Sequence, residues 1–338
     1  MQKIKLGIVG YGNLGRGVEC AAMQNEDMEV TAVYTRRDPK SLRILTPGAQ
    51  VKPIEALDED AQGTGQAQEA CSPDVLLLCG GSAEDLPRQS ARYAARYHIV
   101  DSYDNHRRIP QHIRRVDQAA RRGGKLAAVA IGWDPGLFSL NRAIAEMTLP
   151  CGQNETFWGK GVSQGHSNAL RQVPGVLDGK QYTVPVPVAV AAARSGQISS
   201  LAETEKHLRE CYVVPEEGAD LNRIEQEIMH MPGYFEGYHT MVHFVTQEEL
   251  RLYHRENPHG GMVLRRGRTG KEAEHEALYE LKLKLGSNPE FTANIMVCYA
   301  RAVYRLAAEG EVGCRTVLDI PIAYAFPGNR DALLRTLL

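Results

Sequence analysis

The stretch that decides the fold is residues 4–15, which read "IKLGIVGYGNLG". A buried-strand pattern (4–10) runs directly into the spacing G-x-G-x-x-G, and the residues after it (13–24) suit a helix. In this order the first glycine permits a tight turn, the second lets a diphosphate approach the backbone, and the third lets helix and strand pack closely. The start of the helix adds free N–H groups and the positive end of its dipole. The stretch predicts a dinucleotide-binding unit; the alternative is a glycine-rich turn without a ligand.

Strand-like and helix-like patterns alternate along the rest of the first third of the chain. Further strands are predicted at 29–35, 74–80, 98–104 and 125–132, with helices at 83–97 and 111–124. Such alternation is typical of βαβ units, whose strands lie parallel. We therefore expect an α/β fold with a Rossmann-type doubly wound parallel sheet in a nucleotide-binding domain that covers residues 1–132.

The pattern changes after about residue 150. Stretches at 181–190, 238–246 and 276–285 alternate apolar or β-branched residues with polar ones, which is typical of strands with one covered face. They predict a second α+β domain built on a mixed sheet, at residues 133–288. A long helix is expected from Pro289 to about residue 309, and the terminal segment 289–338 is expected to pack back on the first domain.

A pair of arginines stands about twenty residues after the glycine motif, in "VYTRRDP" (33–39). Folds that bind NAD place an acid at this point for the 2′-hydroxyl of the ribose. Thr35, Arg36 and Arg37 present a hydroxyl and two guanidinium groups instead, which suit a dianionic 2′-phosphate. The sequence therefore predicts NADP over NAD, against the alternative of a solvated turn before Pro39.

The strand at 74–80 ends in small residues, and a strand end of this kind lies under the cofactor in open α/β sheets. Cys79, Gly81 and Ser82 are expected there. Cys79 has no histidine near it in a recognisable pattern, so we do not predict a nucleophile.

Composition excludes several other classes of protein. With a net charge of -2 over 338 residues, there is no electrostatic case for nucleic acid. No apolar run approaches the ~20 residues of a membrane helix, and the N-terminus shows no secretory pattern. The seven cysteines are scattered without a C-x-x-C, and no metal-ligand spacing is found. We expect a cytoplasmic chain with no metal, nucleic-acid or membrane partner.

Five further stretches carry a resemblance to a known family. They are "VDSYDNHRRIP" (100–110), "GWDPGLFSLNR" (132–142), "TFWGKGVSQGHSNALR" (156–171), "NPHGG" (257–261) and "NPEFTAN" (288–294). With the glycine motif and "TRR", they resemble the meso-diaminopimelate dehydrogenases almost from end to end. The resemblance implies an enzyme that carries out NADP-dependent, reversible oxidative deamination of meso-2,6-diaminopimelate at its D-centre in lysine and diaminopimelate biosynthesis. The products would be ammonia, NADPH and L-2-amino-6-oxopimelate, which cyclises to tetrahydrodipicolinate. It also implies a homodimer, with a dimerisation region beside the substrate domain.

The resemblance also implies the site residues. Asp104 and Asp134 are the candidate catalytic residues, since they would hold the reacting amino group so that its Cα–H points at the nicotinamide. The substrate would also be bound by Trp158, Gln164, Gly165, Thr183, Arg209, His259 and Asn288. Of these, Arg209 suits the distal carboxylate through its two-pronged guanidinium. The cofactor would contact Gly10, Tyr11, Gly12, Asn13, Leu14, Gly15, Thr35, Arg36, Arg37, Cys79, Gly81, Ser82, Ser102 and Tyr103.

Structural alternatives remain for these residues. Asp104 could be a turn carboxylate, Asp134 the N-cap of a helix that begins at Pro135, and Arg209 an exposed ion-pair partner. Asn288 fits an N-cap equally well. Asn168 departs from the family pattern, where an aspartate is expected, so a charge for the distal ammonium is missing.

Rival functions also remain open at this point. The chain could be another two-domain NADP-dependent reductase or a D-amino acid dehydrogenase of broad specificity. It could also be an NADP-binding sensor without activity. A sensor would keep the cofactor residues but would not need the set that grips a substrate with two amino-acid heads.

Overall fold

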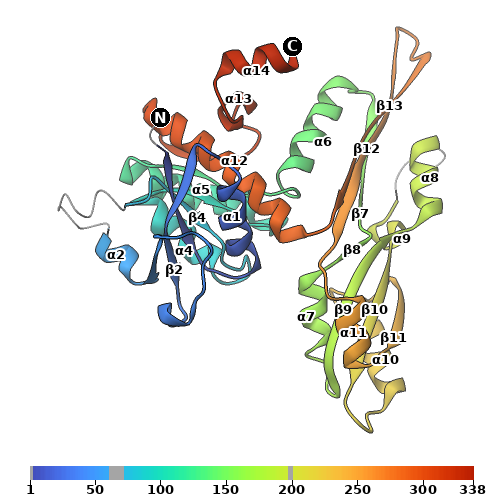
Figure 1. Cartoon of the computed structure of the whole chain (residues 1–338). Coiled ribbons are helices and arrows are strands. Elements are labelled where there is room, and N and C mark those ends of the chain that lie inside the picture. Colours follow the sequence, from blue (N-terminus) through green and yellow to red (C-terminus); the bar gives the residue numbers. More distant parts are fainter. Residues whose placement is uncertain (1–2, 61–71, 197–200) are drawn as a thin grey trace. The chain divides into compact units, whose positions relative to one another are not determined.

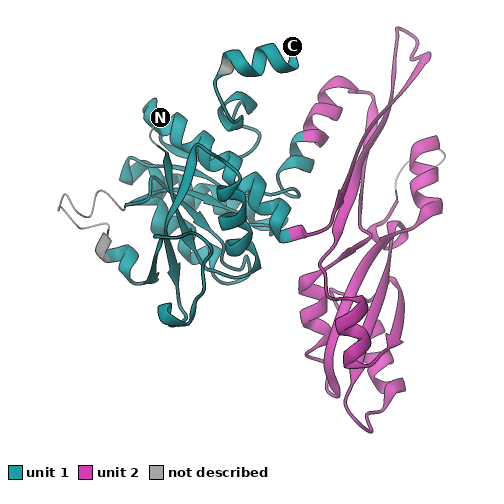
Figure 2. Ribbon diagram, viewed as in Figure 1, with its two compact units in different colours: residues 1–140, 289–338 teal, residues 141–288 magenta. Residues whose placement is uncertain are grey.

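A computed structural model describes residues 3–60, 72–196 and 201–338 (Figure 1). The chain divides into two compact units, coloured separately in Figure 2. Unit 1 consists of residues 1–140 and 289–338, and unit 2 of residues 141–288. The first dividing point thus lies after residue 140, where the sequence analysis expected one after 132.

Unit 1 is built on a seven-stranded sheet in the order β14-β6-β5-β4-β1-β2-β3, with every neighbouring pair parallel. The strands are β1 (Ile4–Val9), β2 (Met28–Thr35), β3 (Gln50–Pro53), β4 (Val75–Leu78), β5 (His98–Asp101), β6 (Leu126–Ala128) and β14 (Gly313–Arg315). The predicted doubly wound parallel sheet is confirmed. The order turns back between β1 and β4, which is the switch point where such sheets bind ligands at their carboxyl edge.

Helices cover both faces of this sheet. The helices that lie in unit 1 are α1 (Asn13–Met23), α2 (Ala56–Asp60), α4 (Leu86–Ala94), α5 (Ile109–Gly123), α12 (Asn288–Ala308), α13 (Ile322–Ala325) and α14 (Arg330–Leu337). Strand β4 shows the two-sided burial, because Val75 and Leu77 join the core beneath α1 and α12, whereas Leu76 and Leu78 join the core beneath α4 and α5. The terminal segment also contributes β14 as the last strand, which the sequence analysis did not foresee.

Unit 2 contains two sheets. A mixed four-stranded sheet, β11-β10-β9-β8, comprises β8 (Gly161–Val162), β9 (Val176–Pro185), β10 (His207–Pro215) and β11 (His239–Phe244). A three-stranded antiparallel sheet, β13-β12-β7, comprises β7 (Gly152–Trp158), β12 (His259–Thr269) and β13 (His275–Leu285). The mixed sheet was expected, and the separate three-stranded sheet was not.

The helices of unit 2 are short. They are α7 (Gln164–Leu170), α8 (Pro187–Ser195), α9 (Glu203–Lys206), α10 (Leu221–Met229) and α11 (Gln247–Tyr253), and α6 (Leu137–Thr148) crosses the dividing point. The predicted strand at 181–190 is wrong beyond Pro185, because α8 begins at Pro187. A proline at the first helical position loses no hydrogen bond, and the alanines after it favour a helix. Across the described parts of both units, no helix combines the length and apolarity that spanning a membrane requires.

Candidate functional site

The turn between β1 and α1 has the geometry of a diphosphate site. Gly10 adopts a φ of +90°, which favours glycine. A Cβ on Gly15 would lie 2.1 Å from the carbonyl oxygen of Gly10, so no side chain fits there. Around Gly12 the described atoms leave open space, and the first turn of α1 carries no acidic residue. The N–H groups at this helix start therefore suit an anion.

The predicted 2′-phosphate residues lie at the end of β2 and just after it. Thr35 is buried, and its hydroxyl accepts a hydrogen bond from the backbone N–H of Arg37 at 3.0 Å. The guanidinium of Arg37 donates to the carbonyl of Tyr11, which lies in the glycine turn. Arg36 is exposed and forms a two-pronged ion pair with Asp85, at 2.9 and 3.1 Å. Arg37 thus contacts the glycine turn, and Arg36 is joined to the loop after β4.

Asp85 was not foreseen as part of this arrangement. Its carboxylate also accepts from the backbone N–H of Gly81 at 3.0 Å, so it joins the loop after β4 to Arg36. Its side chain does not cap α4, although it stands just before that helix, so its sequence position predicted a different role.

Glu19 is a second residue that sequence reasoning missed. Its fully buried carboxylate accepts hydrogen bonds from the backbone of Leu45 at 2.8 Å and of Thr46 at 2.6 Å, and from the hydroxyl of Tyr11. Burial and the neighbouring Glu19 raise the pKa of Tyr11 above its usual value. The carboxylate ties the glycine turn to the segment that follows the arginine pair. An acid on the apolar face of α1, one residue after Val18, was the signal for it.

The loops after β4 and β5 meet at the same edge of the sheet. The backbone N–H of Asp104 donates to the hydroxyl of Ser82 at 3.2 Å. Burial raises the pKa of the Cys79 thiol far above its usual value, which disfavours the thiolate that a nucleophile needs. β5 ends at Asp101, earlier than the predicted residue 104, because the carboxylate of Asp101 accepts from the N–H of Tyr103 and turns the chain.

Asp134 follows β6 at this same edge. A short bridge pairs Trp133 with Gly136, and α6 begins only at Leu137. The interpretation of Asp134 as the N-cap of a helix starting at Pro135 is therefore wrong, because residues 133–136 form a loop of their own.

In unit 2, Thr183 and Arg209 face each other on neighbouring strands. They are direct partners in the antiparallel register of β9 and β10, and both are buried. Arg209 donates to the Thr183 hydroxyl at 2.5 Å, and its guanidinium lies 4.0 Å from the ring centre of Tyr238. Burial lowers the pKa of Arg209. The alternative of an exposed ion-pair partner is excluded, and Nε of Arg209 has no hydrogen-bond partner among the described residues.

The other predicted substrate residues of unit 2 lie on strands and at helix starts. Gly161 pairs with Thr183 in the sheet, and the ring of His259 lies against Gly161, within 2.7 Å of where a Cβ would stand. The backbone N–H of Trp158 donates to His207 at 2.8 Å. Gln164 and Gly165 open α7, and Asn288 opens α12. His259 therefore lies beside Gly161, the residue that pairs with Thr183 in the mixed sheet.

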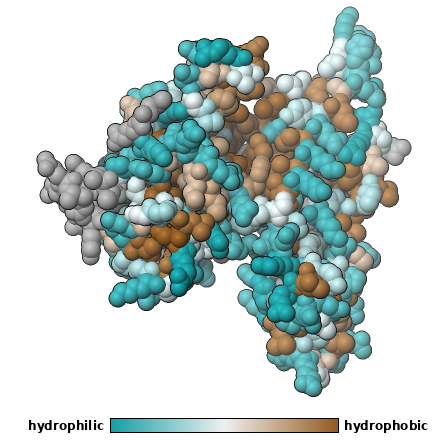
Figure 3. All heavy atoms as spheres, viewed as in Figure 1, coloured by the Kyte–Doolittle hydropathy of each residue, from teal (hydrophilic) through white to brown (hydrophobic). Residues whose placement is uncertain are grey.

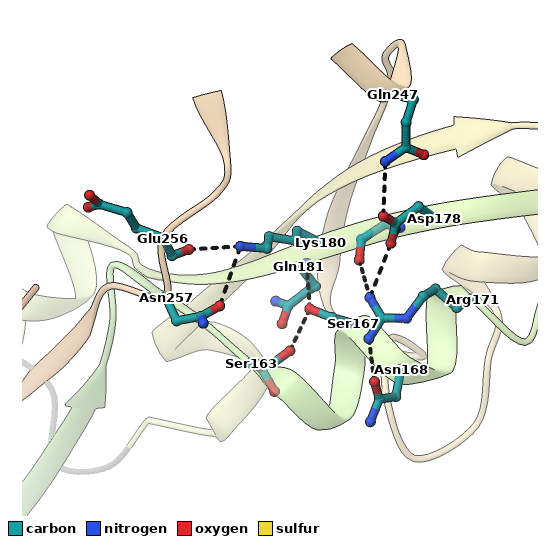
Figure 4. Close-up of polar contacts among 11 residues, drawn as sticks. Ser163, Ser167, Asn168, Arg171, Asp178, Lys180, Gln181, Gln247, Glu256 and Asn257 are labelled. Atoms are coloured by element: carbon teal, nitrogen blue, oxygen red, sulfur yellow. Dashed lines mark hydrogen bonds and ion pairs between the residues drawn. The ribbon is translucent and has the colours of Figure 1, made fainter. Parts of the chain in front are cut away.

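Asn168 makes a local contact on the exposed side of α7 (Figure 4). Its amide oxygen accepts from Arg171, which forms a 3.3 Å ion pair with Asp178 and donates to Gly179. Gln247 completes the chain of contacts by donating to Asp178 at 3.2 Å. The side chain of Asn168 is thus engaged by Arg171, and an aspartate at this position would find the same cationic neighbour.

Known proteins resemble this chain over its whole length. Residues 132–287 match the family model of the diaminopimelic acid dehydrogenase C-terminal domain. The meso-diaminopimelate D-dehydrogenase of Acetivibrio thermocellus is 50% identical over 100% of this chain and 98% of its own length. The enzyme of the same name from Ureibacillus thermosphaericus is 49% identical over 100% of both.

Solved structures agree with these relatives. The Corynebacterium glutamicum DAP dehydrogenase in complex with DAP has a TM-score of 0.89 and 40% identity, covering 100% of both chains. A Clostridium tetani meso-DAPDH mutant with DAP, in which Gln, Thr, Arg, Pro, His and Asn are replaced, has a TM-score of 0.89 and 47% identity, covering 99% and 100%. An engineered D-amino acid dehydrogenase bound to NADP+ has a TM-score of 0.85 and 39% identity, covering 100% of both.

Proposed function

The chain belongs to the meso-diaminopimelate D-dehydrogenase family, and from this premise we propose how its residues carry out the reaction. The protein is an NADP-dependent oxidoreductase that deaminates meso-2,6-diaminopimelate reversibly at its D-centre. The products are ammonia, NADPH and L-2-amino-6-oxopimelate, which cyclises to tetrahydrodipicolinate on the way to lysine and peptidoglycan precursors. The observation that carries this conclusion is the match to enzymes of one activity across the full length of the chain.

Unit 1 holds the cofactor. Bound NADP+ supplies a hydride acceptor at C4 of the nicotinamide. The turn at residues 10–15 offers N–H groups to the diphosphate, and the hydroxyl of Thr35 with the guanidinium groups of Arg36 and Arg37 binds the 2′-phosphate. Arg36 then shares its charge between the phosphate and Asp85. The small residues after β4 and the Ser102–Tyr103 segment after β5 line the same edge of the sheet.

The reacting head of the substrate is assigned to Asp104 and Asp134. Each carboxylate follows a neighbouring strand, β5 or β6, at the carboxyl edge of the sheet. Two carboxylates there can hold the ammonium of the D-head and orient its Cα–H, which is a positioning effect. Because hydride loss from Cα needs the lone pair of the amine, the ammonium gives up a proton before the hydride leaves.

The distal head, with L configuration, is assigned to unit 2. Arg209, already fixed by Thr183, presents its remaining N–H groups to the distal carboxylate, and His259 adds a directional hydrogen bond. The residue types replaced in the Clostridium tetani mutant coincide, apart from one proline, with residues of the proposed substrate set. In chain order they match Gln164, Thr183, Arg209, Pro258, His259 and Asn288, and the first five stand at the same spacings. Trp158 and Gly165 complete the proposed set.

A homodimer in the cytoplasm is the proposed working form. Figure 3 shows apolar side chains gathered over α6 and the three-stranded sheet. Among the exposed apolar residues of these elements are Met147 on α6 and Leu278 on β13. Apolar surface of this kind is common where chains associate. Light scattering after gel filtration tests the proposal, because a dimer has twice the 37.3 kDa mass of one chain. A peak at the mass of a single chain would contradict it.

The function is tested by NADPH formation from the three stereoisomers of diaminopimelate. We expect turnover with the meso isomer and none with the LL isomer, which lacks a D-centre. The DD isomer has a D-centre but presents the wrong configuration to the distal set, so turnover should be weak. Absence of turnover with meso-diaminopimelate, while NADP+ binds, would favour the non-catalytic sensor.

A further inference from the structure

Asp101 is a buried carboxylate to which the proposed reaction assigns no role. It ends β5 and is fully buried. Its two oxygens have different partners. Oδ1 accepts from the backbone N–H of Tyr103 at 3.1 Å and of Ala130 at 3.0 Å. Oδ2 accepts from the hydroxyl of Ser90 at 2.6 Å and from Nε2 of His112 at 2.7 Å. A charge buried at this depth is stabilised only when such donors surround it.

The two oxygens therefore join two kinds of element. The Oδ2 partners lie on helices α4 and α5, which pack on the sheet of unit 1. The Oδ1 partners lie on the loops after β5 and β6. The backbone carbonyl of Asp101 adds a third loop contact, since it accepts from the N–H of Ile131 at 2.9 Å.

These loops are the ones that carry the proposed catalytic carboxylates. Tyr103 immediately precedes Asp104, and Ala130 and Ile131 lie shortly before Asp134. Ala130 adopts a φ of +57°, a conformation that residues other than glycine rarely take and that its surroundings must hold. The ring of His112 stacks on Tyr103 with centroids 4.1 Å apart, which fixes the first loop from the helix side as well.

We propose that Asp101 is a positioning residue that sets the spacing of Asp104 and Asp134 by bonding both of their loops through one carboxylate oxygen. The inference rests on the proposed function, because it takes those two carboxylates as the groups that orient the reacting amine. Asp101 touches neither substrate nor cofactor in this proposal. It acts only through the backbone of the two loops.

The test compares Asp101→Asn with Ser90→Ala in the full-length chain. Asparagine keeps one oxygen for the loops only if its NH2 group faces Ser90 and His112, which must then accept instead of donating; in the other orientation the NH2 group opposes the loop N–H groups. In both orientations the negative charge that the four donors share is lost. We expect its kcat for meso-diaminopimelate to fall on the order of tenfold to a hundredfold, since small misplacements of positioning groups have effects of that size. Affinity for adenosine 2′,5′-bisphosphate, which probes only the phosphate residues, should be unchanged.

Ser90→Ala is the matched control, because it removes one Oδ2 donor and leaves both loop contacts in place. Its melting temperature should fall while its kcat stays within about twofold of the unmodified chain. A purely structural role for Asp101 predicts the same outcome for both variants. If Asp101→Asn is folded and its kcat is also within twofold, the inference is overturned and the proposed function stands. If the unmodified chain does not oxidise meso-diaminopimelate, both fail together.

A measurement without any variant covers the case in which Asp101→Asn does not fold. Hydrogen exchange of the unmodified chain, without ligand, should show the amides of Tyr103 and Ala130 protected as strongly as those of β5. Exchange at the rate of an exposed turn at either amide would overturn the inference, because the loop would then not be held by the carboxylate.

Discussion

The guanidinium of Arg209 donates a 2.5 Å hydrogen bond to the hydroxyl of Thr183, directly opposite it in the antiparallel pair β9–β10. Both side chains are buried, so the cation is oriented before any substrate arrives. Pre-orientation of this kind lowers the entropy lost on binding a carboxylate.

Replacing this arginine should therefore separate binding from chemistry. For Arg209→Lys we expect the KM for meso-diaminopimelate to rise on the order of tenfold to a hundredfold, because a lysine cannot make a two-pronged contact and a charged hydrogen bond is worth about 1.5–3 kcal/mol. The kcat should change much less. Arg223→Lys is the control, since Arg223 forms an exposed ion pair with Glu227 on α10. Equal KM values for the two variants would contradict the assignment of the distal head.

The arginines after β2 should decide the choice of cofactor. In Arg36→Ala with Arg37→Ala, the ratio of kcat/KM for NADP+ to that for NAD+ should shrink sharply, because two charged contacts to the 2′-phosphate are lost. Arg92→Ala is a control of the same charge, with its own exposed ion pair to Asp58. A ratio near one in the unmodified protein would contradict the prediction at once.

Glu19 should support the cofactor site from behind. In Glu19→Leu the N–H groups of Leu45 and Thr46 lose their acceptor, which destabilises the chain by about 1–3 kcal/mol for each donor that stays buried. Because the same carboxylate holds Tyr11, the KM for NADP+ should rise as well. Chemical denaturation and cofactor kinetics measure the two effects. A loss of stability with an unchanged KM would show that Glu19 does not shape the site.

Stability should fall in mild acid because of buried neutral histidines. Burial lowers the pKa of His207 to about 4, and burial together with the cation of Arg209 lowers that of His166 to about 4. Above a pH of about 6.5 such a histidine is neutral in both the folded and the unfolded chain. As the pH falls from there towards 4, the unfolded chain binds a proton that the folded chain does not, so the free energy of unfolding decreases. Each such histidine adds at most about 1.4 kcal/mol per pH unit to the slope of the unfolding free energy in this window.

The variant His207→Gln tests this, because glutamine retains an acceptor for the N–H of Trp158 but does not titrate. Its unfolding free energy should depend less steeply on pH between about 4 and 6.5. His230→Gln is the matched control, since His230 lies at the exposed end of α10. An identical slope in His207→Gln and the unmodified chain would contradict the prediction.

Deamination should be faster in alkaline solution. The reacting amine must lose a proton before the hydride leaves, and the free amine is a minor species near neutrality. The kcat/KM for meso-diaminopimelate should therefore rise with pH, at most about tenfold per unit below the pKa of the amine. The affinity for NADP+, measured over the same range, separates cofactor binding from this effect. A flat profile would argue against deprotonation before hydride transfer.

Sequence reasoning identified the parallel sheet and the phosphate turn because both depend on local pattern. The strand, the glycine spacing and the helix are consecutive, so the sequence alone predicts the tight turn at Gly10 and the close packing at Gly15. The same local reasoning failed at 181–190, where alternating valines and prolines resemble a strand but Pro187 begins α8. It also missed β14, a strand of three residues that only the parallel pairing with β6 defines.

By itself, then, the sequence determined the doubly wound fold, the preference for NADP and the family. Each of these depends on short motifs of neighbouring residues. Only the tertiary structure decided that Arg209 is bonded to Thr183, that Arg36 pairs with Asp85, and that one oxygen of Asp101 holds two loops. The physical reason is register. Which side chains meet across strands and loops depends on how distant segments align, and no local periodicity specifies that alignment.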